Sequence, residues 1–127
     1  MVIDQVKADI EDWLINFVEV PHPALGNWPP CPFARQSRLR NKYDVRLGAD
    51  VERDLFLFAK KQYLGKNDVV IFAYAPDQYD DAYFNWAVDT MNTSKGFRKR
   101  NLLALADHPD TIETHNGVCF NMGKYAL

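Results

Sequence analysis

One short apolar run, Val69-Val70-Ile71-Phe72-Ala73-Tyr74-Ala75, constrains the fold more than any other part of this chain. Its β-branched and aromatic residues favour a strand, and the absence of alternating polar residues indicates a strand with both faces covered. A strand over residues 69–74 is therefore expected at the centre of a sheet. The run is much too short to cross a bilayer, which takes about 20 residues, so no membrane association is expected.

Helical patterns flank this strand. Apolar residues recur at the spacing of three and four that is typical of a helix packed on a core in three segments: residues 3–18, 50–64 and 77–93. Pro21 ends the first, because proline has no amide hydrogen to donate. Asp50 is well placed to cap the second, and Gly96 is expected to end the third.

Strand candidates alternate with these helices and continue after them. They are residues 43–47, 69–74 and 102–106, then a terminal hairpin that turns at 121–124 and returns through 125–127. Alternation favours parallel strands joined by right-handed crossovers. We predict a single globular domain over residues 1–127, of the α/β (or α+β) class, with three helices on a small layered sheet of four to five strands. A ferredoxin-like arrangement is the close alternative, because the tail strands can pair antiparallel at an edge.

Charge and composition restrict the function classes. Lys and Arg number 15 against 17 Asp and Glu, so the net charge of −2 gives no general attraction to nucleic acid or acidic membranes. The N-terminal residues do not resemble a secretory signal, which predicts a cytoplasmic protein. In that compartment Cys31 and Cys119 are expected to be reduced thiols rather than a disulfide.

Polar residues follow each of the three main predicted strands. They are Gly48-Ala49-Asp50, Ala75-Pro76-Asp77 and Asp107-His108-Pro109-Asp110. If the strands are parallel, these residues lie along one edge of the sheet, where open α/β folds bind ligands, so Asp77 and Asp107 are candidate ligand-binding residues. The alternative is structural: Asp50 and Asp77 cap helices, and the residues around His108 form a solvated turn.

Cys31 is a candidate nucleophile. Nearby cations lower the pKa of a thiol, and Arg35 and Arg38 follow it closely in the sequence. In this enzyme hypothesis His108 acts as the base, and Arg35 or Arg38 binds a small anionic substrate. The competing interpretation is that two prolines and a phenylalanine beside Cys31 anchor a loop to the core and leave the thiol inert.

A transition-metal site is not expected, although the residue types for one are present. His22, Cys31, His108, His115 and Cys119 lack the closely paired spacing of a structural zinc site. The cysteines are better explained as small apolar groups in the packing. No cofactor is predicted.

Two segments are locally basic, residues 35–46 and 97–100. Together they could bind a phosphate-bearing ligand or a single-stranded nucleic acid, with Tyr43 and Phe97 available for stacking. A solvated basic face is the favoured interpretation, so nucleic acid is not the expected partner.

The segment Cys31-Pro32-Phe33-Ala34 resembles an uncharacterised family of small bacterial proteins. In that family a helix containing a tryptophan, here Trp13, precedes this tetrapeptide, and a strand ending in His-Pro, here His108-Pro109, follows it. The chain departs from the family at Pro29-Pro30 and at Asp110-Thr111-Ile112. It is also similar in style to hypothetical proteins of marine bacterial viruses. The resemblance implies the order of elements and a pairing of Cys31 with His108, but no activity.

The leading functional prediction is a non-catalytic binding or interaction protein, acting as a homo-oligomer in one version of the hypothesis. It rests on the lack of a complete catalytic set in the sequence and on four aromatic surface candidates: Trp28, Tyr43, Tyr79 and Phe97. The alternatives are the Cys31 enzyme and phosphate or nucleic-acid binding through the two basic segments.

Overall fold

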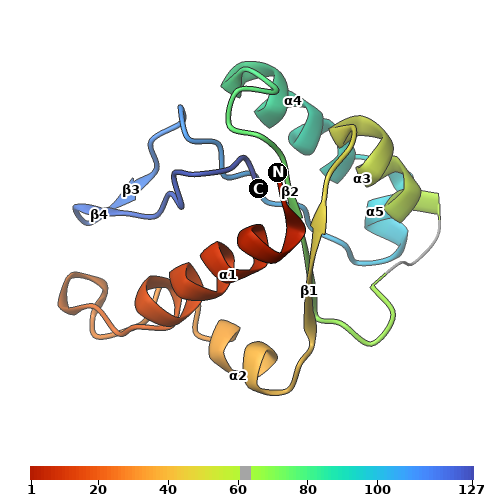
Figure 1. The fold of residues 1–127 in the computed structure, drawn as a ribbon. Helices are drawn as coiled ribbons and strands as arrows, with labels where there is room; N and C mark the ends of the chain where they lie inside the picture. Colours follow the sequence, from red (N-terminus) through yellow and green to blue (C-terminus); the bar gives the residue numbers. More distant parts are fainter. Residues whose placement is uncertain (61–63) are drawn as a thin grey trace.

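The structure is a computed structural model that describes residues 1–60 and 64–127 (Figure 1). Helices and strands are mixed along the chain in this order: α1 (Ile3–Trp13), α2 (Ala34–Leu39), β1 (Tyr43–Leu47), α3 (Val51–Lys60), β2 (Val69–Ala73), α4 (Asp81–Asn92), α5 (Lys95–Lys99), β3 (Thr114–His115) and β4 (Val118–Cys119). A π-helical segment, Leu14–Val18, extends α1. Within the described residues, no helix has the length and apolar character needed to span a bilayer.

β1 and β2 form the parallel pair that the sequence predicts. The register runs from Tyr43 opposite Val69 to Leu47 opposite Ala73. In Figure 1, α1 lies across one side of this pair, whereas α3, α4 and α5 lie on the other. Each side has its own buried cluster, so the fold has a thin two-stranded centre between helical layers.

The two clusters are separate sets of side chains. Residues of α1 and its extension pack with the strands in the first: Val6, Ile10, Leu14, Val18, Val45 and Ala73. Residues of α3, α4 and the C-terminal segment pack with Tyr74 in the second: Val51, Phe84, Ala87, Val88 and Ala126. Burial of these apolar surfaces is the main favourable contribution to folding.

Tyr74, directly after β2, joins the layers. Its side chain is 2% exposed, and its hydroxyl donates to Asp54 Oδ2 at 2.8 Å. Its ring lies against Gly48, where a Cβ atom would come within 2.1 Å of a ring carbon. Its backbone N–H and C=O both bond to Ala126, at 2.8 and 3.1 Å. One residue therefore connects both strands, α3 and the C-terminal segment.

The C-terminal segment also reaches α1 and residue 107. The Tyr125 hydroxyl donates to Asp9 Oδ2 at 2.5 Å, and this bond, with the Gln5 amide bond, lowers the pKa of Asp9. Leu127 and Asp107 exchange two backbone hydrogen bonds, both of 3.0 Å. Three chain segments, at residues 74, 126–127 and 107, thus lie side by side beyond β2, joined by isolated backbone hydrogen bonds rather than by regular strands.

The predicted sheet of four to five strands is wrong, as is the ferredoxin-like alternative. The strands among the described residues form two two-stranded sheets, the parallel pair β1–β2 and the antiparallel hairpin β3–β4. Residues 102–106 form no strand, because the backbone of Ala104 bonds to the side-chain amide of Asn92 instead of to a neighbouring strand. Among the residues that the structure describes, β2 has no strand partner besides β1, and Val69 is 45% exposed.

The terminal hairpin forms earlier in the chain than predicted. It turns at Asn116 and Gly117, which both have positive φ, 51° and 81°, as asparagine and glycine tolerate. Residues 125–127 pair with Tyr74 and Asp107 instead of forming the second strand of the hairpin.

The three predicted helices are present with changed limits. α4 begins at Asp81 rather than at residue 77, because the Asp80 carboxylate accepts from Tyr83 N at 2.7 Å and caps it there. Gly96 lies inside the unpredicted short helix α5. Asp50 caps α3 as predicted, accepting from Arg53 N at 3.0 Å. The predicted end of this helix is near residue 64. The structure describes α3 as far as Lys60, and residues 61–63 lie outside the described part of the chain.

Gly96 allows α5 to pack closely on α3. A Cβ atom there would come within 2.4 Å of the Ala59 carbonyl oxygen. We predict that Gly96→Ala lowers the free energy of unfolding by about 1–3 kcal/mol through overpacking. Urea denaturation measures this loss, with Lys95→Ala on the exposed side of the same helix as the control, expected within about 0.5 kcal/mol of the parent. Equal stability of the two variants would contradict the close contact.

Candidate functional site

Structural partners hold three of the polar residues predicted at one edge of the sheet: Asp50, Asp107 and His108. The Asp107 carboxylate accepts from Asn121 Nδ2 at 2.8 Å and from Met122 N at 3.0 Å, which holds the C-terminal segment. Gln78 Nε2, one residue after the exposed Asp77, donates to the Ala49 carbonyl at 3.1 Å. These residues lie near the end of the strands, but their hydrogen bonds join the loops to one another.

His108 is buried, with 1% of its surface exposed. Its Nδ1 lies 3.1 Å from Asp110 N and can only accept from that amide. Nε2 therefore carries the proton and donates to the Tyr79 carbonyl at 2.8 Å. Its ring also contacts Phe84 in the cluster formed by α3 and α4. Both nitrogens of this imidazole are bonded to the backbone.

Cys31 lies in the other cluster. It is partly buried against the residues of α1, and its amide donates to the Val18 carbonyl at 3.1 Å. Arg35 is exposed on α2. Arg38 forms a bidentate ion pair with Glu19, with N–O distances of 2.7 and 2.8 Å, and this bond raises its pKa. No hydrogen bond joins Cys31 to His108 in residues 1–60 and 64–127.

The remaining metal-ligand candidates are engaged locally. His22 Nδ1 accepts from Ala24 N at 3.2 Å, His115 Nε2 lies 3.0 Å from Glu113 Oε1, and Cys119 Sγ lies 3.5 Å from Asn121 Oδ1. In the part of the chain that the structure describes, no three His, Cys, Asp or Glu residues are grouped to hold a metal ion.

Several arginines of the two basic segments are bonded to other groups of the chain. Arg46 pairs with Asp44 at 3.0 Å, and Arg100 donates to the Ala59 and Lys60 carbonyls at 2.6 and 2.8 Å. Phe97 is 3% exposed, so the prediction that it is available for stacking is wrong. Among the aromatic surface candidates, Trp28 is 64% exposed, and Tyr43 and Tyr79 are half-buried.

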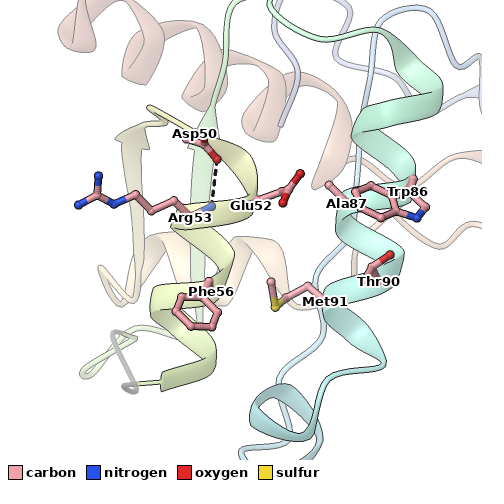
Figure 2. Close-up of a pocket in the computed structure, with 8 residues that line it drawn as sticks. All are labelled: Asp50, Glu52, Arg53, Phe56, Trp86, Ala87, Thr90 and Met91. Carbon is pink, nitrogen blue, oxygen red and sulfur yellow. Dashed lines mark hydrogen bonds between the residues drawn. The ribbon is translucent and has the colours of Figure 1, made fainter.

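A groove of about 420 Å³ lies between α3 and α4 (Figure 2). Asp50, Glu52, Arg53 and Phe56 line it from the α3 side, and Trp86, Ala87, Thr90 and Met91 line it from α4. Phe56 and Trp86 are 48% and 55% exposed, so the groove has partly uncovered aromatic walls. Figure 2 shows Glu52 and Met91 pointing into the space between the helices, whereas the Arg53 side chain points away from α4.

Two carboxylates line the groove at the start of α3. Glu52 Oε1 accepts from the Tyr83 hydroxyl across the helices, which fixes the carboxylate and raises the pKa of Tyr83 to about 12. Asp50, which caps α3, also lines the groove. Because the Arg53 guanidinium points outward, the groove presents negative charge next to apolar walls.

Aromatic rings support both walls. Tyr79, which precedes α4, stacks on Tyr83 of α4 at 5.4 Å between ring centroids, and Tyr83 lies 5.9 Å from Trp86. On α3, the Lys60 ammonium lies 4.9 Å from the Phe56 ring centroid. The Phe56 ring thus already has a cation of the chain itself over it.

Comparisons with known proteins give no match among family models, curated proteins or solved structures. The resemblance at Cys31-Pro32-Phe33-Ala34 stays a prediction.

Phe56 and Trp86 are apolar residues of the predicted helical segments 50–64 and 77–93, and the helical pattern of these segments predicts no groove. A signal was present in the second helix, whose apolar residues cover more of its circumference than one core contact requires.

The bonds of His108 predict a structural role that stability measurements can test. His108→Ala leaves a cavity and removes the partners of two backbone groups, so we expect a loss of about 2–4 kcal/mol in the free energy of unfolding. His115→Ala, at an exposed histidine of the β3–β4 hairpin, is the control, with an expected loss under about 1 kcal/mol. If His108→Ala were as stable as the parent protein, the structural role of the His108 imidazole would be contradicted.

The hydrogen bond from the Tyr83 hydroxyl to Glu52 predicts a raised pKa for Tyr83. The folded state holds the Tyr83 proton up to about pH 12, whereas tyrosines in an unfolded chain lose theirs near pH 10. The contribution of the Tyr83–Glu52 hydrogen bond to the stability of the fold is therefore complete below pH 10 and decreases as the pH rises toward 12. Absorbance at 295 nm follows the ionisation of the tyrosines, and the difference from Tyr83→Phe isolates that of Tyr83. In Glu52→Gln, the midpoint of the Tyr83 titration should fall toward pH 10. An unchanged midpoint would exclude the bond across the groove.

Proposed function

We propose that the protein is a non-catalytic binding protein and that the groove between α3 and α4 binds a partner protein through a segment carrying lysine or arginine beside aliphatic residues. The observation that carries the proposal is the combination of exposed aromatic walls with fixed carboxylates. A cytoplasmic location and a relation to viral proteins stay predictions.

Charge complementarity favours a partner segment that carries positive charge. Glu52 Oε1 is occupied by Tyr83, which leaves the second carboxylate oxygen for an incoming cation. An ammonium or guanidinium group beside Glu52 and Asp50 would meet negative charge, and its carbon chain would lie along Trp86 or Phe56. An acidic segment would face repulsion at the same position, so the groove discriminates by sign.

Apolar contacts supply the second part of the interaction. Ala87 and Met91 form the α4 side of the groove between the two aromatic residues. Methionine adapts to different aliphatic shapes, which suits a surface that binds a peptide. An open groove with such walls accepts side chains projecting from a segment of chain.

The placement of Cys31 and His108 favours binding over the enzyme hypothesis. The two side chains belong to different packed clusters, and the imidazole nitrogens are bonded to the backbone. A basic phosphate-binding face has weaker support, because Arg38, Arg46 and Arg100 have partners within the chain.

Peptide titrations test the proposal. A peptide of alternating lysine and leucine, added to ¹⁵N-labelled protein, should bind with a Kd below about 1 mM and shift amide signals of residues 50–56 and 86–91. Replacing lysine with glutamate in the peptide should abolish binding. Binding that is equally tight for both peptides, or shifts confined to other residues, would contradict the groove as the site.

Two variants separate the contributions of charge and aromatic contact. Glu52→Gln should weaken binding of the lysine peptide about 5- to 30-fold and reduce its salt dependence. Trp86→Ala should weaken binding at least about tenfold, as expected for an aromatic anchor. Asp12→Asn, an exposed acid on α1, is the matched charge control and should bind like the parent. A loss in the control equal to that in Glu52→Gln would indicate only nonspecific attraction.

A further inference from the structure

Three side chains of α3 form a row along the groove. Glu52, Phe56 and Lys60 are spaced four residues apart, so they lie on one face of the helix with about 6 Å of rise between neighbours. Glu52 and Phe56 line the groove, and Figure 2 shows Phe56 further along α3 than Glu52. The Lys60 ammonium lies 4.9 Å from the centroid of the Phe56 ring. The row therefore runs from an acid through an aromatic ring to a cation.

The acidic end of the row is at the start of α3. Asp50 and Glu52 are the two acids among the described residues that line the groove, and the Tyr83 hydroxyl of α4 holds the Glu52 carboxylate in place. Within residues 1–60 and 64–127, no lysine or arginine forms an ion pair with either carboxylate. This end of the groove therefore attracts a cation.

The opposite end of the row is basic. Arg100, which follows α5, donates to the Ala59 and Lys60 carbonyls at 2.6 and 2.8 Å, so its guanidinium lies beside the backbone of Lys60. The neighbouring helix α5 adds three exposed cations: Lys95, Arg98 and Lys99. In the described part of the chain, no carboxylate forms an ion pair with Lys60. This end therefore attracts an anion.

We propose that the groove binds an extended segment of the partner protein that carries a cation, an aliphatic residue and an acid at alternate positions. The lysine or arginine of the segment meets Glu52, the aliphatic side chain lies against Phe56 and Met91, and the aspartate or glutamate meets Lys60. The inference rests on the proposed function of the groove and adds a required acidic residue to its partner. It also fixes which end of the groove receives each charge.

The spacing of an extended chain matches the row on α3. Alternate residues of a strand lie on the same face and are about 6.6 Å apart. Neighbours in the row are about 6 Å apart, so the mismatch over the whole row is only about 1 Å, which flexible charged side chains absorb. A segment whose cation and acid are adjacent in sequence presents them on opposite faces and cannot meet both ends of the row.

The two ends also discriminate against a segment with charges of one sign. A second cation in the segment would face Lys60, and a second acid would face Glu52. Because the Lys60 ammonium already lies over the Phe56 ring, a cation of the partner is directed to the Glu52 end. The groove thus favours a segment with no net charge, although the protein itself has a net charge of −2.

Titrations of ¹⁵N-labelled protein with three capped peptides test this pattern. GKSLSEG carries the proposed arrangement, GKSLSKG replaces its acid with a second lysine, and GKELSSG has the composition of the first peptide with its charges adjacent. GKSLSEG should bind about three- to tenfold more tightly than GKSLSKG and about two- to fivefold more tightly than GKELSSG. Nonspecific attraction to a protein of net charge −2 would give the opposite order for the first two peptides. Tighter binding of GKSLSKG, or equal binding of all three peptides, would overturn the inference.

Charge reversal at Lys60 tests which residue recognises the acid. Lys60→Glu should invert the preference, so that GKSLSKG binds more tightly than GKSLSEG, and Lys60→Gln should bring the two affinities within about twofold. Lys7→Glu, at an exposed lysine of α1 on the other side of the β1–β2 pair, makes the same change in net charge and should keep the preference of the parent. A parent-like preference in Lys60→Glu, or an inverted preference in Lys7→Glu, would contradict recognition of the acid by Lys60.

The outcomes separate this inference from the proposed function. If GKSLSEG and GKSLSKG bind equally and both shift amide signals of residues 50–56 and 86–91, the groove is a binding site and the requirement for an acid is wrong. If none of the peptides shifts these signals, including the peptide of alternating lysine and leucine, the groove is not a binding site and both proposals are wrong.

Discussion

The arrangement around Tyr74 is the constraint on which the rest of the structure depends. A sheet of only two strands offers little surface, and the helical layers on its two sides do not merge into one cluster. Tyr74 bridges this division with its ring against Gly48, its hydroxyl on Asp54 and its backbone on Ala126. Burial and the Asp54 bond raise its pKa, which keeps the phenol neutral in the fold. The groove depends on this arrangement, because Asp54 belongs to α3 and Tyr74 packs on Phe84 of α4.

Local sequence patterns predicted the elements well where local physics decides them. The strands at residues 43–47 and 69–73 and the cap at Asp50 follow from side-chain type and position. Residues 102–106 alternate in burial like a strand, yet they lack a strand neighbour because the Asn92 amide takes that place. Such a contact, between residues twelve positions apart, has no sequence signature.

The candidate site shows the same limit. Sequence reasoning selected residues with reactive chemistry, and His108 and Asp107 instead hold loops together through buried hydrogen bonds. The groove depends on which parts of two helical stripes remain uncovered. The apolar character of Phe56 and Trp86 predicts contact with other side chains, but the number of covering layers is a property of the assembled fold. With two strands at the centre, fewer side chains are covered than a larger sheet would cover.

The bond between Tyr125 and Asp9 joins residues 116 positions apart. Together with the pairing of Tyr74 and Ala126, it connects α1 to the end of β2 through residues 125 and 126. Loop closure over such a separation is entropically costly and slows folding. A change at residue 125, such as loss of the Tyr125 hydroxyl, would therefore act on a helix formed by residues 3–13.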